Sequence, residues 1–139
     1  MSEIALAHEM NAGLEIHDSE VRSVEANANS LTVAFSAAYV HRSSGRPGFD
    51  AGSGYAQSVE MEFSGATWVG SLPECVGRLS DGQVVSNGVA RSLIELPYSS
   101  SGSVSAEHQF TNGSLLSVSA SALVCRFTGE PRFIESFSC

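Results

Sequence analysis

The stretch GSLLSVSASALVCRF, residues 113–127, is the clearest indication of the fold, because its apolar and polar residues alternate almost one by one. One side of the alternation carries Leu116, Val118, Ala120, Ala122 and Val124, and the other carries Ser117, Ser119 and Ser121. Successive side chains of a β-strand point to opposite faces, so this period of two predicts a strand with one buried face. We therefore expect a long, half-buried strand in this segment.

The same alternation recurs in three other segments. The shared apolar side consists of Leu31, Val33, Phe35, Ala37 and Tyr39 within residues 30–41, of Val59, Met61 and Phe63, and of Val104, Ala106, His108 and Phe110. Helical periodicity is weak after position 13, and we expect at most a short helix at 3–12 and one helical turn at 71–78. The pattern predicts an all-β fold, an antiparallel, meander-rich sandwich or partly closed barrel of about eight to ten strands.

Turn residues fall between the apolar runs, where hairpins require them. The pairs are Asn112-Gly113, Asn87-Gly88 and Asp81-Gly82. Asn-Gly and Asp-Gly tolerate the positive φ angles of a type I′ turn, so each pair predicts a two-residue hairpin connection. Three such connections favour a meander.

The length and charge of the chain limit its partners. Its 139 residues suit a single β domain over 1–139, with residues 1–13 as a short helix or a flexible extension. The net charge is -8, from fifteen acidic residues and seven basic ones, all of them arginine. Nucleic acids and anionic membranes attract clustered Lys and Arg, so we expect neither as a partner.

The N-terminal residues and the cysteines indicate a cytoplasmic protein. The opening MSEIALAHEMNAG lacks the basic and long apolar regions of a signal peptide, and no segment is long and apolar enough for a membrane helix. Cys75, Cys125 and Cys139 are widely spaced, which argues against a disulfide framework or a structural zinc knot. We expect a free thiol at Cys139.

The segment YVHRSSGRPGFDAGSGY, residues 39–55, contains most of the candidate functional residues. They are His41, Arg42, Arg46, Asp50 and Tyr55. A phosphate-binding loop would lead into a helix and supply a lysine, whereas this segment leads into an alternating strand without one. Two interpretations stay open, a structural connection between strands and a binding loop, since long loops in compact domains are often functional.

The pair His17-Asp18 is the second candidate. Neighbouring side chains of a regular strand face opposite ways, so both residues serve one metal or substrate only if the chain bends there. The alternative is that Asp18 caps a turn through backbone hydrogen bonds. A metal site assembled from His17, His41, His108 and Asp50 lacks any local ligand spacing, so we expect no metal and no cofactor.

The segment LEIHDSEVRSVEANANSLTVAF, residues 14–35, resembles the opening of small bacterial β proteins that start with an apolar-x-His-Asp-Ser motif. This group includes the immunity-protein-50-like domains of bacterial toxin systems. The later GSLLSVSASALVCRF is similar to their long penultimate strand. The resemblance implies a compact β fold and, for some relatives, the binding and neutralisation of a toxin. It implies no catalytic residues.

These observations favour a non-enzymatic module that binds a protein, either one with a basic surface or a second copy of this chain as a homodimer. The charge of -8 favours a basic partner because it accelerates encounter with a cation-rich patch. One alternative is a small hydrolase or metal-dependent enzyme that uses His17, Asp18, His41 and Asp50. Another is a carrier that holds an apolar ligand inside a barrel. A barrel interior filled by side chains excludes the carrier.

Overall fold

The computed structural model describes residues 11–137 and confirms an all-β fold. The strands are β1 (Asn11–Asn27), β2 (Ser30–Ser43), β3 (Gly52–Ser64), β4 (Thr67–Val69), β5 (Gly77–Ser86), β6 (Val89–Arg91), β7 (Leu93–Leu96), β8 (Tyr98–Phe110), β9 (Leu115–Phe127) and β10 (Arg132–Phe137). A short 3-10 helix, η1 (Leu72–Glu74), supplies the helical turn expected within 71–78.

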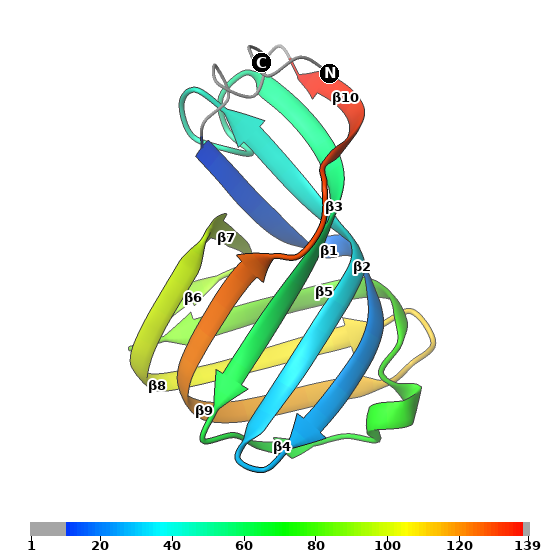
Figure 1. Cartoon of the computed structure of the whole chain (residues 1–139), viewed down its shortest axis with the longest axis vertical. Coiled ribbons are helices and arrows are strands. Elements are labelled where there is room, and N and C mark those ends of the chain that lie inside the picture. The colour runs from blue at the N-terminus through cyan, green and yellow to red at the C-terminus, as the bar shows by residue number, and fades with distance from the viewer. Residues whose placement is uncertain (1–10, 138–139) are drawn as a thin grey trace.

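Six of these strands form a closed antiparallel barrel (Figure 1). Its strands follow one another in the order β3, β2, β1, β5, β8 and β9, and pairing between β9 and β3 closes the ring. The closing ladder runs from Val59 opposite Phe127 to Ser64 opposite Ala122. The sequence left a sandwich and a partly closed barrel open. The structure is a barrel, and it is closed.

Strands β1, β2 and β3 continue beyond the barrel and remain paired with one another there, in a region that we call the upper sheet. It consists of residues 11–15 of β1, 38–43 of β2 and 52–57 of β3, flanked by β7 and β10. Figure 1 shows this sheet above the barrel. Among the strands of residues 11–137, the upper sheet does not close as the barrel does, and β7 and β10 are its edge strands.

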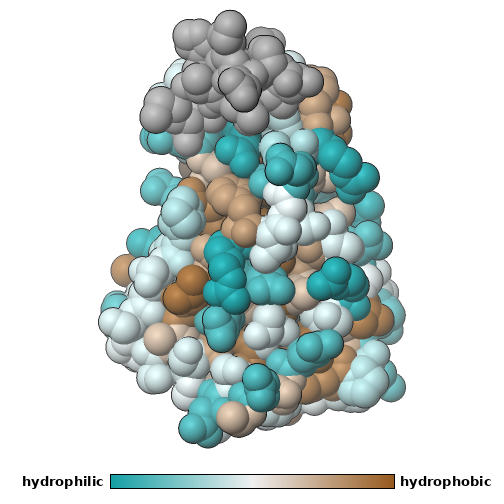
Figure 2. All heavy atoms as spheres, in the orientation of Figure 1, coloured by the Kyte–Doolittle hydropathy of each residue, from teal (hydrophilic) through white to brown (hydrophobic). Residues whose placement is uncertain are grey.

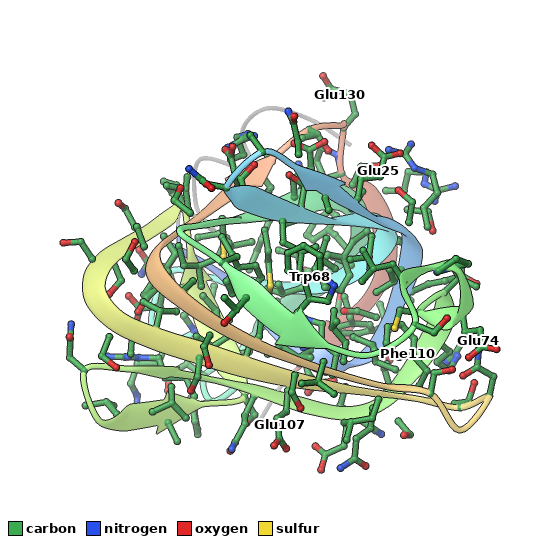
Figure 3. The ribbon with its side chains drawn as sticks, turned by 90° about the horizontal axis from the view of Figure 1, so that it is seen from below. Glu25, Trp68, Glu74, Glu107, Phe110 and Glu130 are labelled. Carbon is green, nitrogen blue, oxygen red and sulfur yellow. The ribbon has the colours of Figure 1, made fainter. Side chains whose placement is uncertain are left out.

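The interior of the barrel is filled by side chains. Figure 3 looks into it from below and shows Trp68 and Phe110 inside the ring of strands, whereas Glu107 points outward. The buried core includes Phe35, Phe63, Phe110 and Leu116, each at most 3% exposed. Because these side chains occupy the interior, the space that a carrier would need for an apolar ligand is taken.

The alternation in the stretch 113–127 holds for its first half and reverses in its second. Leu116 and Val118 are buried as predicted, but Val124 is 38% exposed, and Leu123 and Cys125 are buried instead. Leu123 pairs with Phe63 across the closing ladder, so barrel closure selects it for the interior. The prediction that Val124 faces the core is wrong.

The three turn pairs behave differently from one another. Asn87 and Gly88 both have positive φ and connect β5 to β6, as predicted. Asn112-Gly113 connects β8 to β9, but of the two only Gly113 has positive φ, so the turn is not type I′.

Asp81-Gly82 is not a turn, because both residues lie inside β5. A Cβ atom at Gly82 would lie 2.4 Å from Ile16 Cγ2, so the glycine permits close approach of two strands.

The remaining expectations concern the N-terminus, the membrane and the cysteines. Residues 3–10 of the expected N-terminal helix lie outside the described residues, and residues 11–12 belong to β1 instead. Within residues 11–137, no helix has the length and apolar character needed to cross a membrane.

Cys75 and Cys125 are buried free thiols, and burial raises the pKa of Cys125 to about 12. Cys139 lies outside the described residues.

Candidate functional site

A large bulge in β1 marks the junction between the barrel and the upper sheet. Glu15 lies opposite Tyr39, and the next paired residues are Glu20 and Ala37, so the chain from 16 to 19 bulges out of the ladder. Asp18 has a φ of 72°, in the left-handed region that residues other than glycine rarely adopt. The bulge is fixed by the Ser19 hydroxyl, which donates to the Glu15 carbonyl and accepts from the Tyr39 amide, at 2.6 and 2.9 Å.

The bulge brings His17 and Asp18 to the same side of the chain. His17 Nδ1 lies 3.2 Å from Asp18 Oδ2, which a regular strand does not allow for neighbouring residues. A carboxylate oxygen of Glu15 lies within 4.8 Å of both donor atoms. Arg78 Nη1, from β5, approaches the other oxygen of Asp18 at 3.7 Å. The chain therefore has the bend that His17 and Asp18 need in order to act on one metal or substrate.

His41 joins this group from β2. Its Nε2 lies 3.4 Å from Glu15 Oε1, and its side chain is only 13% exposed. The His41 ring packs between the rings of Tyr39 and Phe137, with centroids 4.9 and 5.4 Å away. We call Glu15, His17, Asp18 and His41 the junction cluster.

The surroundings of the junction cluster are acidic. The Tyr39 hydroxyl donates a hydrogen bond to Glu135 Oε2. Burial raises the pKa of Tyr39 well above its usual range, and the negative charges of Glu135, Glu15 and Asp18 act in the same direction. A hollow of about 360 Å³ opens beside Tyr39, lined by Asp18, Glu20, Ala37, Ala38, Tyr39, Ala56, Arg78 and Ile134.

The glycine-rich loop, residues 44–51, folds on itself and against the upper sheet. The Asp50 carboxylate accepts a hydrogen bond from the Arg46 amide at 2.6 Å and lies 3.6 Å from Arg46 Nε. The loop packs closely against β1, because a Cβ atom at Gly13 would lie only 3.1 Å from Pro47 Cβ. Arg46 and Asp50 are thus partners of each other.

The loop also forms one wall of a pocket of about 440 Å³, which we call the loop pocket. It is lined by Arg46, Pro47, Phe49, Arg91, Ser92, Leu93, Glu95 and Tyr98. The guanidinium of Arg46 lies 5.4 Å from the centroid of the Phe49 ring, and that of Arg91 lies 5.9 Å from the Tyr98 ring. A guanidinium stacked on a ring keeps its in-plane N–H groups available as donors.

Arg42 and Tyr55 form a third group. Tyr55 is buried, and the Arg42 guanidinium lies 5.7 Å from its ring and 5.0 Å from that of Phe127. Arg42 Nη2 also donates to Gln57 Oε1 at 2.7 Å. These contacts join β2, β3 and β9 and give the pair a structural role in packing.

The seven predicted site residues therefore separate into three groups. His17 and Asp18 pair with each other and His41 reaches them through Glu15, Arg46 and Asp50 pair within the loop, and Arg42 and Tyr55 pack together. The enzyme hypothesis requires Asp50 beside the two histidines, whereas the contacts of Asp50 described above lie within its own loop.

Sequence reasoning missed Glu15 and Arg91, and it favoured a core position over a pocket for Tyr98. A signal existed for Glu15, since it stands two positions before His17, where an extended chain faces the same side. Arg91 and Tyr98 reach the loop only through the fold, because they lie forty or more residues from it in the chain. Comparison with known proteins gives no match among family models, curated proteins or solved structures.

Proposed function

We propose that this protein is a non-enzymatic binding module that recognises another protein through the loop pocket. The observation that carries the proposal is the pairing of two arginines with two aromatic rings around one pocket, Arg46 with Phe49 and Arg91 with Tyr98. Arginine and aromatic residues are enriched among those that dominate the energy of protein interfaces. The resemblance to immunity-type proteins agrees with this role.

The chemistry of the loop pocket defines what enters it. Phe49 is 65% exposed at the rim, so its ring offers apolar area that a partner can cover. The two guanidinium groups offer hydrogen-bond donors to carbonyl or carboxylate oxygens. The pocket therefore suits a partner segment with an apolar side chain and acceptor oxygens beside it.

The charge of the whole molecule acts at longer range than the pocket. At a net charge of -8, approach of a partner with a basic surface is accelerated, and this acceleration weakens as salt screens the field. We expect the association rate of the partner to fall as salt is raised. An association rate indifferent to salt would contradict the steering argument.

Site-specific crosslinking tests the proposal. Phe49 is replaced by photoreactive benzoylphenylalanine in the native cells, and the matched control carries the same group at Val69, which is 76% exposed on β4. Figure 1 shows β4 at the end of the barrel opposite the upper sheet. We expect a discrete adduct from position 49 and none from position 69. The same adducts from both positions, or none from either, would contradict the proposal.

The captured partner is then purified and its affinity measured. Phe49→Ser and Arg91→Ala are each expected to weaken binding at least about tenfold, the range of residues that dominate an interface. Val69→Ser is the control, because it also removes an exposed apolar side chain. Equal affinity of all three variants would show that the loop pocket is not the contact surface.

A second copy of the chain is the other candidate partner, and the features of β10 favour it. This strand ends the upper sheet, and Phe133 and Ile134 on it are 55% and 47% exposed. Figure 2 shows apolar side chains gathered where β10 ends. Within residues 11–137, β10 pairs only with β3, and a sheet edge with apolar side chains favours strand pairing between copies. Sedimentation tests this, since a dimer that dissociates on Ile134→Lys substitution supports pairing through β10, and a monomer at all concentrations excludes it.

A further inference from the structure

The junction cluster combines two imidazoles with two carboxylates, which distinguishes it from an ordinary acidic surface patch. His17 and His41 come from different strands, and each places a ring nitrogen against a different carboxylate of the cluster. Imidazole nitrogen and carboxylate oxygen are the ligands that zinc and related divalent transition metals accept together. Magnesium and calcium instead prefer shells made of oxygen.

Two of the six separations among the four ligands fit a tetrahedral metal site. Zinc bonds of about 2.0–2.1 Å to nitrogen or oxygen place neighbouring donors of a tetrahedron roughly 3.3–3.4 Å apart. The two separations are 3.2 Å, between His17 Nδ1 and Asp18 Oδ2, and 3.4 Å, between His41 Nε2 and Glu15 Oε1. Donor atoms of Glu15, His17 and Asp18 all lie within 4.8 Å of one another, and His41 reaches this group through Glu15. The shell closes when the His41 side chain turns toward the other three ligands.

Neighbouring groups already orient two of the four ligands, His41 and Asp18. The His41 ring is held between Tyr39 and Phe137. Arg78 approaches Oδ1 of Asp18, while Oδ2 faces His17. The backbone at Asp18 is fixed in the left-handed region within a bulge that Ser19 stabilises. Such outer contacts orient metal ligands and strengthen binding.

We propose that Glu15, His17, Asp18 and His41 together bind one divalent transition metal ion of the zinc class. This ion joins β1 to β2 at the point where their hydrogen-bonded ladder is interrupted. An ion that binds only the folded chain stabilises it by mass action, so the site reinforces the junction between the barrel and the upper sheet. The inference does not depend on the loop pocket, and it goes beyond protein binding.

Equilibrium dialysis with Zn²⁺ and absorption spectroscopy with Co²⁺ test the site in the full chain. We expect one Zn²⁺ per chain, a higher melting temperature with Zn²⁺ than with chelator, and the intense visible bands of tetrahedral Co²⁺. Loss of a direct ligand, in His17→Ala or His41→Gln, is expected to weaken Zn²⁺ binding by more than the roughly 10–100-fold that loss of an outer contact causes.

Two further variants keep the test decisive. Asp18→Asn preserves a residue that tolerates the left-handed φ, so it removes the ligand charge while the bulge stays folded. Asp50→Asn removes a carboxylate that pairs with Arg46 outside the cluster and is expected to leave Zn²⁺ binding unchanged. Far-UV circular dichroism verifies that each variant is folded. Absence of stoichiometric binding, weak bands of six-coordinate Co²⁺, or binding that survives in folded His17→Ala and His41→Gln would overturn the proposal.

Discussion

The closed barrel and the upper sheet are built from the same first three strands, yet their surroundings differ. In the barrel each of the six strands pairs on both sides, and the interior is filled by apolar side chains. In the upper sheet the same strands are flanked by β7 and β10, which pair on one side only within the described part of the chain, beside the bulge at 16–19 and the loop at 44–51. Closure removes the unpaired edges of a sheet, whereas the edge strands of an open sheet leave backbone N–H and C=O groups available for binding. We therefore expect the barrel to carry most of the stability, and we propose the upper sheet and its loop as the region that recognises a partner.

The largest expected effect is a cavity in the barrel. Phe63→Ala removes a fully buried ring and is expected to lower the free energy of unfolding by about 3–5 kcal/mol. Phe49→Ala, at the exposed rim of the loop pocket, is expected to change it by less than about 0.5 kcal/mol. Urea unfolding of both variants measures the difference. Similar losses for the two would mean that the loop contributes to stability as much as the barrel does.

Two glycine substitutions compare how tightly the barrel and the upper sheet are packed. In Gly82→Ala the new Cβ meets Ile16 and the Glu107 carbonyl inside the barrel, at a cost of about 1–3 kcal/mol in unfolding free energy. In Gly54→Ala, within the upper sheet, the Cβ meets the hydroxyl end of the half-buried Tyr39, whereas at Gly82 it meets the fully buried Ile16 and a backbone carbonyl. We expect a smaller loss for Gly54→Ala. A loss as large as that of Gly82→Ala would show that the upper sheet is packed as rigidly as the barrel.

His108 makes the barrel sensitive to acid. Burial lowers the pKa of this histidine, and a smaller effect of the Glu107 backbone opposes the shift. As pH falls, the unfolded chain binds a proton before the folded one, so stability is complete above about pH 6.5 and is lost below it, by up to about 1.4 kcal/mol per pH unit. Unfolding free energies from pH 5 to pH 8 measure this loss. His108→Leu is expected to flatten the profile, and an unchanged profile would refute the assignment to His108.

The smallest expected effect lies on the barrel surface. Arg126 contacts Glu60 and Glu62 at 3.1 and 3.0 Å, and these hydrogen bonds raise its pKa. Exposed ion pairs of this kind contribute little, so Arg126→Ala is expected to cost less than about 1 kcal/mol in unfolding free energy and less still in high salt. A loss that salt does not reduce would point to the packing of the arginine stem instead of its charge.

The sequence predicted the strands well because alternation depends only on which face is buried. It failed where the fold changes that face, since Leu123 and Val124 exchange sides at the closing ladder with β3. It also took Gly82 for a turn residue, because composition does not distinguish positive φ from the close approach of another strand. Both errors depend on contacts between segments distant in the chain.

The candidate site was predictable only in part, because its geometry also depends on contacts between segments distant in the chain. The sequence identified His17, Asp18 and His41 and stated that a bend was needed to unite the first two. The bulge supplies that bend through Ser19 and the pairing of β1 with β2, which no local pattern reveals. Arg91 entered the loop pocket only through tertiary structure.

Native-state hydrogen exchange tests the division between barrel and upper sheet most directly. Amides within the paired barrel segments of β5, β8 and β9 are expected to exchange only through global unfolding, because each of these strands is held on both sides. Paired amides of β7 and β10 are expected to exchange through local opening, at a lower free energy and with weaker dependence on denaturant. Equal free energies of exchange in both regions, rising and falling together with denaturant, would contradict the account.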